Sequence, residues 1–194
     1  RTFLSFVRDR TALNLLRQIP NIISVFRILL VAPILWLLLE NDYGYALILF
    51  AVAGISDGID GFLAKRFNWQ TWIGGLLDPL ADKLLLVSSF LALGWLGLLP
   101  LWLVALVFLR DLVVVAGATY YHHHVGKVGG EPTLISKVNT FVQILLVLVV
   151  VFAQIVNIPG LLILLLIALV TITRISSGID YVIKWSRRAR LVHK

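Results

Sequence analysis

Four aspartates stand in two closely spaced pairs within a chain that is otherwise strongly apolar. Asp57 and Asp60 are three positions apart, and Asp78 and Asp82 are four positions apart. On an α-helix both spacings place side chains on one face, so each pair can present its carboxylates together. Carboxylates at close quarters repel one another, and a divalent cation is the usual compensation. Hard oxygen donors favour Mg²⁺ or Mn²⁺, and two ions balance four negative charges better than one.

Glycines accompany both aspartate pairs, at Gly58, Gly61, Gly74 and Gly75. In a helix interior each glycine costs about 1 kcal/mol relative to alanine. Such glycines either admit a backbone or a flat ligand, or let membrane helices pack closely. Their interleaving with four acids favours the approach of a ligand.

The elements that must position these acids are membrane helices. Of the 194 residues, 60% are hydrophobic and 14% are charged, whereas soluble domains average about 45–50% and 25%. Runs of spanning length occur at residues 22–39, 43–62, 76–96, 101–121, 134–156 and 158–177. We therefore predict an all-α integral membrane protein with six transmembrane helices. The predicted spans leave only short loops and two tails, which are too short for a separate soluble catalytic domain. The absence of cysteine excludes thiolate chemistry.

Short segments with turn-forming residues divide the runs and set the predicted organisation. Turns at 40–42, 97–100 and 157–160 make neighbouring spans antiparallel. Residues 1–18 mix large apolar residues with arginines, which favours an amphipathic helix on the bilayer surface over a disordered basic tail. The six-helix domain is predicted at 19–183, with a basic cytoplasmic tail at 184–194. Three adjacent histidines, 122–124, cannot share one helix face and are expected in a solvated loop.

Lysine and arginine gather on one side of the predicted membrane domain. The turns at 40–42, 97–100 and 157–160 contain neither residue. Basic residues outside the spans lie instead in the two tails and the other two connections, at Arg1, Arg8, Arg10, Arg17, Lys65, Arg66, Lys127, Lys184, Arg187, Arg188, Arg190 and Lys194. Both termini are therefore expected to face the cytoplasm or the mitochondrial matrix.

Ionisable residues also lie inside the apolar runs or at their edges. Each costs about 2.5–3.5 kcal/mol at the bilayer centre, so lipid-facing positions are implausible. They are Arg27, Asp57, Asp60, Asp78, Asp82, Lys83, Arg110, Asp111, Lys137, Arg174 and Asp180. All map to the cytoplasmic half or middle of their helices, which predicts one wet cavity open to the cytoplasm. A divalent-cation transporter is the alternative of a different class, but the apolar outer halves offer no route across.

The aspartate segment resembles the signature of the CDP-alcohol phosphatidyltransferases, D-x2-D-G-x2-A-R-x8-G-x3-D-x3-D. Seven of its eight specified positions are met over 26 residues, by Asp57, Asp60, Gly61, Ala64, Gly74, Asp78 and Asp82. Lys65 replaces the family arginine, and Arg66 follows it. The charge is kept, but the bidentate fork is lost unless Arg66 supplies it.

Within this family, the chain most resembles the cardiolipin synthases of the CMP-forming type. The likeness lies in residues 132–140, Val142-Gln143, Ala51-Val52-Ala53-Gly54 and the pair Arg110-Asp111. Phosphatidylglycerophosphate synthases share the Ile19-Pro20-Asn21 opening and the segment 77–83, and they are the close rival. The resemblance implies transfer of a phosphatidyl group from CDP-diacylglycerol to phosphatidylglycerol, or to glycerol 3-phosphate in the rival reading, with release of CMP.

The resemblance also implies roles for individual residues. The expected metal ligands are Asp57, Asp60, Asp78 and Asp82, and Asp82 is also expected to act as the general base. CDP-binding is expected from Asn21, Asp57, Gly61, Ala64, Lys65, Arg66, Gly74 and Asp78, and Arg27 is a further candidate for the nucleotide or diphosphate. Arg110, Lys137 and Arg174 are expected to bind the acceptor phosphate, the alternatives being an Arg110–Asp111 ion pair and a snorkelling Lys137.

The same resemblance implies the setting of the enzyme. It is expected in the bacterial plasma membrane or the mitochondrial inner membrane, among membrane lipids and as a homodimer. No nucleic-acid partner is expected.

Overall fold

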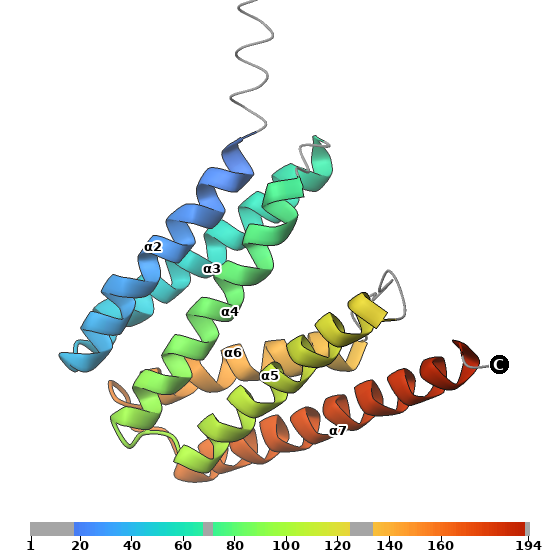
Figure 1. The fold of residues 1–194 in the computed structure, drawn as a ribbon. Coiled ribbons are helices and arrows are strands. Elements are labelled where there is room, and N and C mark those ends of the chain that lie inside the picture. Colours follow the sequence, from blue (N-terminus) through green and yellow to red (C-terminus); the bar gives the residue numbers. More distant parts are fainter. Residues whose placement is uncertain (1–17, 68–71, 125–133, 193–194) are drawn as a thin grey trace, which may run out of the picture. The chain divides into compact units, whose positions relative to one another are not determined.

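The computed structural model describes residues 18–67, 72–124 and 134–192, and their regular structure is entirely helical (Figure 1). The helices are α2 (Ile19–Leu39), α3 (Tyr43–Arg66), α4 (Trp72–Trp95), α5 (Leu101–His124), α6 (Leu134–Phe152) and α7 (Gly160–Val192). The predicted all-α class is confirmed for these ranges. The predicted interfacial helix at 1–18 lies outside them, apart from Gln18.

The turn between α2 and α3 shows why the chain reverses at 40–42. Asn41 adopts a left-handed conformation with φ 64°, which asparagine tolerates better than most residues. The amide of Asp42 donates to the Leu37 carbonyl at 2.8 Å, and the amide of Asn41 donates to Leu38 at 3.1 Å. These bonds form a Schellman motif, which satisfies the last carbonyls of α2. The polar segment thus ends one helix and starts its antiparallel neighbour.

The end of α4 forms the same Schellman motif, with glycine in the left-handed position. Gly97 has φ 72°, Leu98 donates to the Leu93 carbonyl at 2.9 Å, and Gly97 donates to Gly94 at 3.2 Å. Gly94 itself lies against α5, because a Cβ atom built there would stand 2.8 Å from Cγ2 of Val104. A glycine at this position therefore permits close contact between consecutive helices.

Several helix boundaries differ from the sequence-based expectations, and three of these differences change what was expected of a segment. Helix α6 ends at Phe152 rather than at residue 156, because the chain turns at 153–156. Helix α7 continues beyond residue 177 to Val192, so most of the predicted basic tail is helical. The histidines at 122–124 form the last turn of α5; the predicted solvated loop is therefore wrong, since helical backbone does not require the three side chains to share a face.

Two described helices contain stretches long and apolar enough to cross a membrane, at Asn21–Leu39 and Gly160–Gly178. Tyr43–Ile59 and Val138–Phe152 are shorter apolar stretches. The outer faces of the two long stretches are apolar, with Leu29, Trp36 and Leu164 all more than half exposed. These features fit a membrane protein, and the count of six spans stays a prediction.

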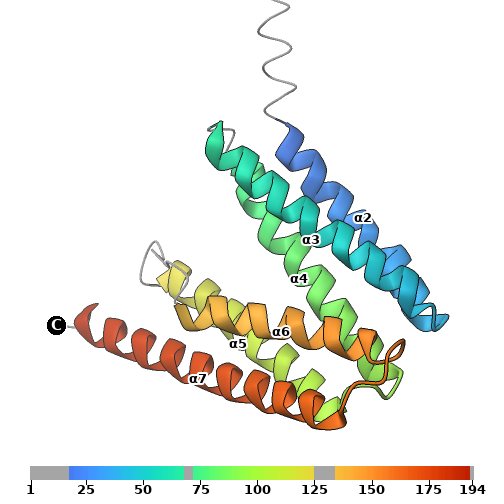
Figure 2. The same ribbon diagram turned by 180° about the vertical axis from the view of Figure 1, so that it is seen from behind.

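The chain divides within α4 into two compact units, residues 1–89 and 90–194. In the first unit, α2 packs along α3 (Figure 2). The buried stripe of each helix is apolar toward their shared turn and becomes polar away from it. It is formed by Leu38, Ile34, Leu30, Arg27 and Ser24 on α2, and by Ala46, Phe50, Ala53 and the partly buried Asp57 on α3.

The second unit repeats this change from apolar to polar. Helix α7 packs against both α5 and α6. Its buried stripe runs through Leu166 and Val170 to Arg174 and Ser177. On α6 the apolar core at Leu146 and Val150 gives way to Asn139 and Gln143. In each unit the polar side chains therefore continue a packed helix interface.

Candidate active site

Arg27 of α2 links two aspartates that come from different helices. Its Nη1 atom lies 2.6 Å from Oδ1 of Asp57 on α3 and 2.6 Å from Oδ1 of Asp82 on α4. The arginine side chain is 1% exposed, whereas those of Asp57 and Asp82 are 47% and 45% exposed. The guanidinium thus lies beneath two carboxylates that stay accessible from outside.

Ser24 extends this cluster by one helical turn. Its hydroxyl donates a hydrogen bond to Oδ1 of Asp78. With Asp57 and Asp82, Asp78 completes the three paired aspartates whose side chains the structure describes. Ser24 and Arg27 are three positions apart on α2, and Asp78 and Asp82 are four apart on α4. The two spacings match because residues three or four apart share a helix face. Helix α2 therefore holds both acids of the α4 pair.

The glycines of α3 leave space beside these acids. Among the described residues, no atom lies within 4 Å of a Cβ built at Gly54, Gly58 or Gly61. The described chain therefore does not show the close helix packing that would explain these glycines without a ligand. An accessible face of small residues next to carboxylates gives a ligand room to reach the backbone of α3.

Several residues predicted for this site have no described side chain. Asp60, Ala64 and Lys65 lie on α3 and Gly75 on α4, but only their helical backbone is described. Asn21 lies near the start of α2, Gly61 is half-buried, Arg66 is exposed at the end of α3, and Gly74 is buried on α4.

Among the described side chains, no three acids or histidines are grouped as an ion-binding set. The donor type nevertheless fits, because the carboxylate oxygens of Asp57, Asp78 and Asp82 are the hard donors that Mg²⁺ and Mn²⁺ prefer.

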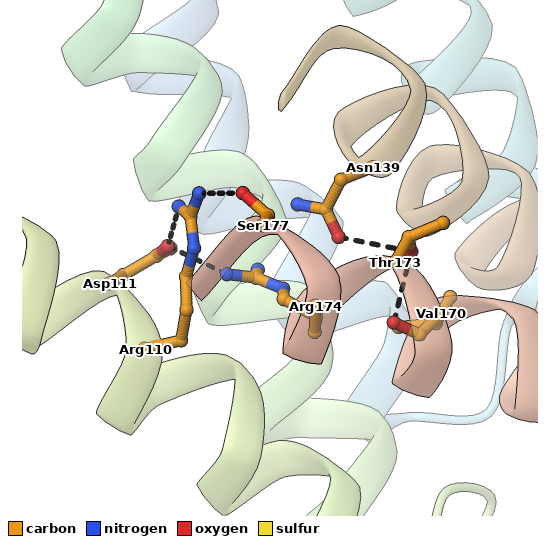
Figure 3. Close-up of polar contacts among 7 residues, drawn as sticks. All are labelled: Arg110, Asp111, Asn139, Val170, Thr173, Arg174 and Ser177. Atoms are coloured by element: carbon orange, nitrogen blue, oxygen red, sulfur yellow. Dashed lines mark hydrogen bonds and ion pairs between the residues drawn. The ribbon is translucent and has the colours of Figure 1, made fainter. Parts of the chain in front are cut away.

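The second unit contains a separate ionic cluster between α5 and α7 (Figure 3). One oxygen, Oδ1 of Asp111, accepts hydrogen bonds from Nη1 of Arg110 at 2.9 Å and from Nη1 of Arg174 at 2.7 Å. Nη2 of Arg110 also donates to the Ser177 hydroxyl at 2.6 Å. The Arg110–Asp111 ion pair, the alternative to phosphate binding, is thus present. With two guanidiniums and one carboxylate, the trio keeps a net charge of +1.

Buried amides on α6 lie in the same unit. Asn139 is 3% exposed and accepts a hydrogen bond from the Thr173 hydroxyl at 3.3 Å, as Figure 3 shows. Gln143, one turn further along α6, is also buried. Within the described part of the chain, Nε2 of Gln143 and Nε of Arg174 have no hydrogen-bond partner. Lys137, the third predicted acceptor-binding residue, lies on α6, and its side chain is not described.

The sequence reasoning missed three contributions to these clusters. It gave Ser24 and Ser177 no role, although each bonds a predicted site residue. It considered Arg27 only as a candidate for the nucleotide or diphosphate, whereas the structure places its guanidinium on two aspartates. A usable signal was present: Ser24 and Arg27 lie on one face of an apolar helix, at a spacing that matches an acidic pair.

Comparisons with known proteins identify the family to which the sequence is similar. The model of the family described as CDP-alcohol phosphatidyltransferase matches residues 17–175. Cardiolipin synthase (CMP-forming) of Rattus norvegicus is 38% identical over 146 residues, which cover 66% of this chain and 48% of the relative. The protein of that name from Streptomyces coelicolor is 40% identical over 129 residues, covering 63% and 60% of the two chains.

A relative with another printed name is also similar. CDP-diacylglycerol--glycerol-3-phosphate 3-phosphatidyltransferase 1, chloroplastic, of Oryza sativa is 36% identical over 149 residues, 67% of this chain and 45% of the relative. The chain thus spans about half the length of most of these relatives. Because the family model matches residues 17–175, from the start of α2 to the middle of α7, and so covers both described clusters apart from Ser177, the chain belongs to the CDP-alcohol phosphatidyltransferase family.

Proposed function

We propose that the protein is a membrane phosphatidyltransferase that makes cardiolipin from CDP-diacylglycerol and phosphatidylglycerol and releases CMP. The observation that carries this proposal is the convergence of Asp57 and Asp82 on one cationic group, beside the open glycine face of α3. Relatives named cardiolipin synthase, 38–40% identical, support the choice of product. A cation transporter explains neither these similarities nor the glycine face.

The donor is proposed to bind at the aspartate cluster. Asp57, Asp60, Asp78 and Asp82 would hold Mg²⁺ or Mn²⁺, with two ions expected. When bound, the metal supplies neutralisation of the diphosphate and of the charge that develops on the departing CMP oxygen. The residues assigned to CDP from the signature would then orient the nucleotide along α3 and the start of α4.

Asp82 is proposed as the general base. The acceptor hydroxyl oxygen forms a bond to the phosphorus that carries diacylglycerol, and the bond from that phosphorus to the bridging oxygen breaks. Asp82 takes the hydroxyl proton, and CMP leaves with the bridging oxygen. Arg27 holds one oxygen of this carboxylate, and the side chain is 45% exposed, so it is accessible to the acceptor. An ordinary carboxylate is a weak base for an alcohol, so positioning supplies much of the acceleration.

The acceptor is proposed to be recognised through its phosphate. Arg110 and Arg174 carry two guanidiniums fixed on one carboxylate oxygen, and arginine guanidiniums are strong phosphate ligands. Lys137 is assigned to the same role. The net positive charge of the Asp111 trio and the buried Nε donor of Arg174 support this assignment.

A second candidate uses glycerol 3-phosphate as the acceptor and makes phosphatidylglycerophosphate. The similarity to the Oryza sativa relative, whose printed name contains glycerol-3-phosphate, favours it. Both acceptors carry a phosphate and a free hydroxyl, so the described clusters suit either one. Cytoplasmic termini, a homodimer and the choice between bacterial and mitochondrial membranes stay predictions from the sequence.

One assay separates the two candidates. The purified protein is given labelled CDP-diacylglycerol and Mg²⁺ or Mn²⁺, together with phosphatidylglycerol in one reaction and glycerol 3-phosphate in another. The proposal predicts cardiolipin and CMP in the first reaction. Formation of phosphatidylglycerophosphate only, in the second reaction, would replace it with the second candidate.

A further inference from the structure

Arg27 occupies a position that normally belongs to an apolar side chain. It follows Leu38, Ile34 and Leu30 along the buried stripe of α2, and it is 1% exposed. Arginine is almost never fully buried unless it is paired, because moving its charge out of water is costly. The sequence tolerates the residue here because Asp57 and Asp82 both form ion pairs with it and compensate its charge.

The two aspartates in turn depend on Arg27. Asp57 and Asp82 come from separate helices and meet at a single nitrogen atom, with both contacts at 2.6 Å. Without a cation between them, two carboxylates at this separation repel each other. Arg27 lies on their buried side, so it can compensate their charge without covering the accessible side. The guanidinium is therefore built into the cluster as a fixed cation.

We infer that Arg27 is the resident counter-ion of the aspartate cluster: it positions Asp57 and Asp82 and makes the stability of the fold largely independent of bound divalent cation. This inference rests on the proposed metal-dependent function. Arg27 is a positioning residue, since it acts on the substrates only through the two carboxylates. Without it, the acids would be compensated mainly by the divalent ion, and stability would become coupled to ion binding.

The test measures apparent Tm of the full chain in detergent micelles, by tryptophan fluorescence, in EDTA and in millimolar Mg²⁺. For the unmodified chain we expect a small difference between the two conditions. Arg27→Gln should lower the apparent Tm in EDTA by about 5–10 °C, and Mg²⁺ should recover most of that loss. Arg27→Lys keeps the charge on a shorter side chain. Its apparent Tm in EDTA should lie between those of the unmodified chain and Arg27→Gln.

Leu30→Ala is the matched control, because Leu30 lies on the same buried stripe one turn away. Its apparent Tm should fall by the same amount in EDTA and in Mg²⁺. An equal Mg²⁺ response in Arg27→Gln and Leu30→Ala would overturn the inference. If Arg27→Gln does not fold in either condition, Arg27→Lys decides: a larger Mg²⁺ response than in Leu30→Ala supports the inference, and an equal response overturns it.

A separate readout identifies failure of the proposed function. The unmodified chain should release CMP in Mg²⁺, and this release should stop when EDTA is added. Metal-dependent CMP release combined with equal Mg²⁺ responses in the variants overturns the role of Arg27 alone. Absence of CMP release with every acceptor and metal overturns the proposed function, and this inference with it.

Discussion

Arg174 donates a hydrogen bond from Nη1 to Oδ1 of Asp111 at 2.7 Å, although 63 positions separate the two residues. The same oxygen also accepts from Arg110 at 2.9 Å. A single carboxylate on α5 therefore fixes two guanidiniums, one from its own helix and one from α7. Both arginine side chains are already held in position before an anion binds, which lowers the entropic cost of binding.

Replacing Asp111 with asparagine should therefore affect both stability and binding. Removing one partner of a buried ion pair costs about 3–5 kcal/mol, and the partial exposure of Asp111 favours the lower end. Apparent Tm should fall by about 6–12 °C, and KM for the acceptor should rise more than KM for CDP-diacylglycerol. Ser177→Ala, which removes one hydrogen bond, should cost only about 1 kcal/mol. Equal effects of the two variants would contradict the shared role of Asp111.

Asp82→Asn keeps the shape of the side chain and an oxygen that can accept from Arg27, but it removes the proposed base. The turnover number should fall by about 10²–10⁴-fold, the usual contribution of a general base. CMP release under saturating substrates measures it. Asp42→Asn, an exposed aspartate in the turn before α3, should leave turnover unchanged. Full turnover by Asp82→Asn would remove Asp82 from the mechanism.

Gly61→Leu tests whether the open face of α3 is where the donor binds. No described atom would meet the new side chain at its Cβ, so apparent Tm should not fall. A bulky group there should still obstruct the nucleotide and raise KM for CDP-diacylglycerol by about tenfold or more, equivalent to 1.4 kcal/mol. Gly44→Leu, on the same helix and equally open, is the control and should leave KM unchanged. An unaltered KM in Gly61→Leu would place the donor elsewhere.

Gly94→Ala tests the contact between α4 and α5. The added methyl group would stand 2.8 Å from Cγ2 of Val104, a stiff β-branched residue, so the helices must shift. The free energy of unfolding should fall by about 1–3 kcal/mol, as for other overpacked sites. Gly54→Ala, in open space inside α3, should instead be neutral or stabilising by up to about 1 kcal/mol. Denaturation of both variants in mild detergent measures the difference.

The helices could be predicted from the sequence better than their ends. The turns at 40–42 and 97–100 were predictable because Asn41 and Gly97 are residue types that adopt positive φ. The end of α6 was not, because the chain stays largely apolar from Phe152 to Val156 while its backbone already turns. Hydropathy reports which residues suit lipid. It therefore also missed the charged continuation of α7 to Val192.

The candidate site was predictable in its residue types but not in its pairings. Helical spacing put Asp78 and Asp82 on one face, and the structure shows α2 contacting both. The sequence could not show that Arg27 would join Asp57 to Asp82, because that contact depends on how three helices pack. Asp111 was recognised as an unusual charge beside Arg110, but its bond to Arg174 spans 63 positions and depends on the packing of α5 against α7.

Direct measurement of Mn²⁺ binding tests the central claim most directly. Electron paramagnetic resonance of the purified chain, titrated with Mn²⁺ in the presence of CDP-diacylglycerol, counts the bound ions. The account predicts about two bound Mn²⁺ per chain, as expected for four carboxylates, and a loss of bound Mn²⁺ in Asp57→Asn but not in Asp42→Asn. A folded, unmodified chain that binds no Mn²⁺ with the donor present would contradict it.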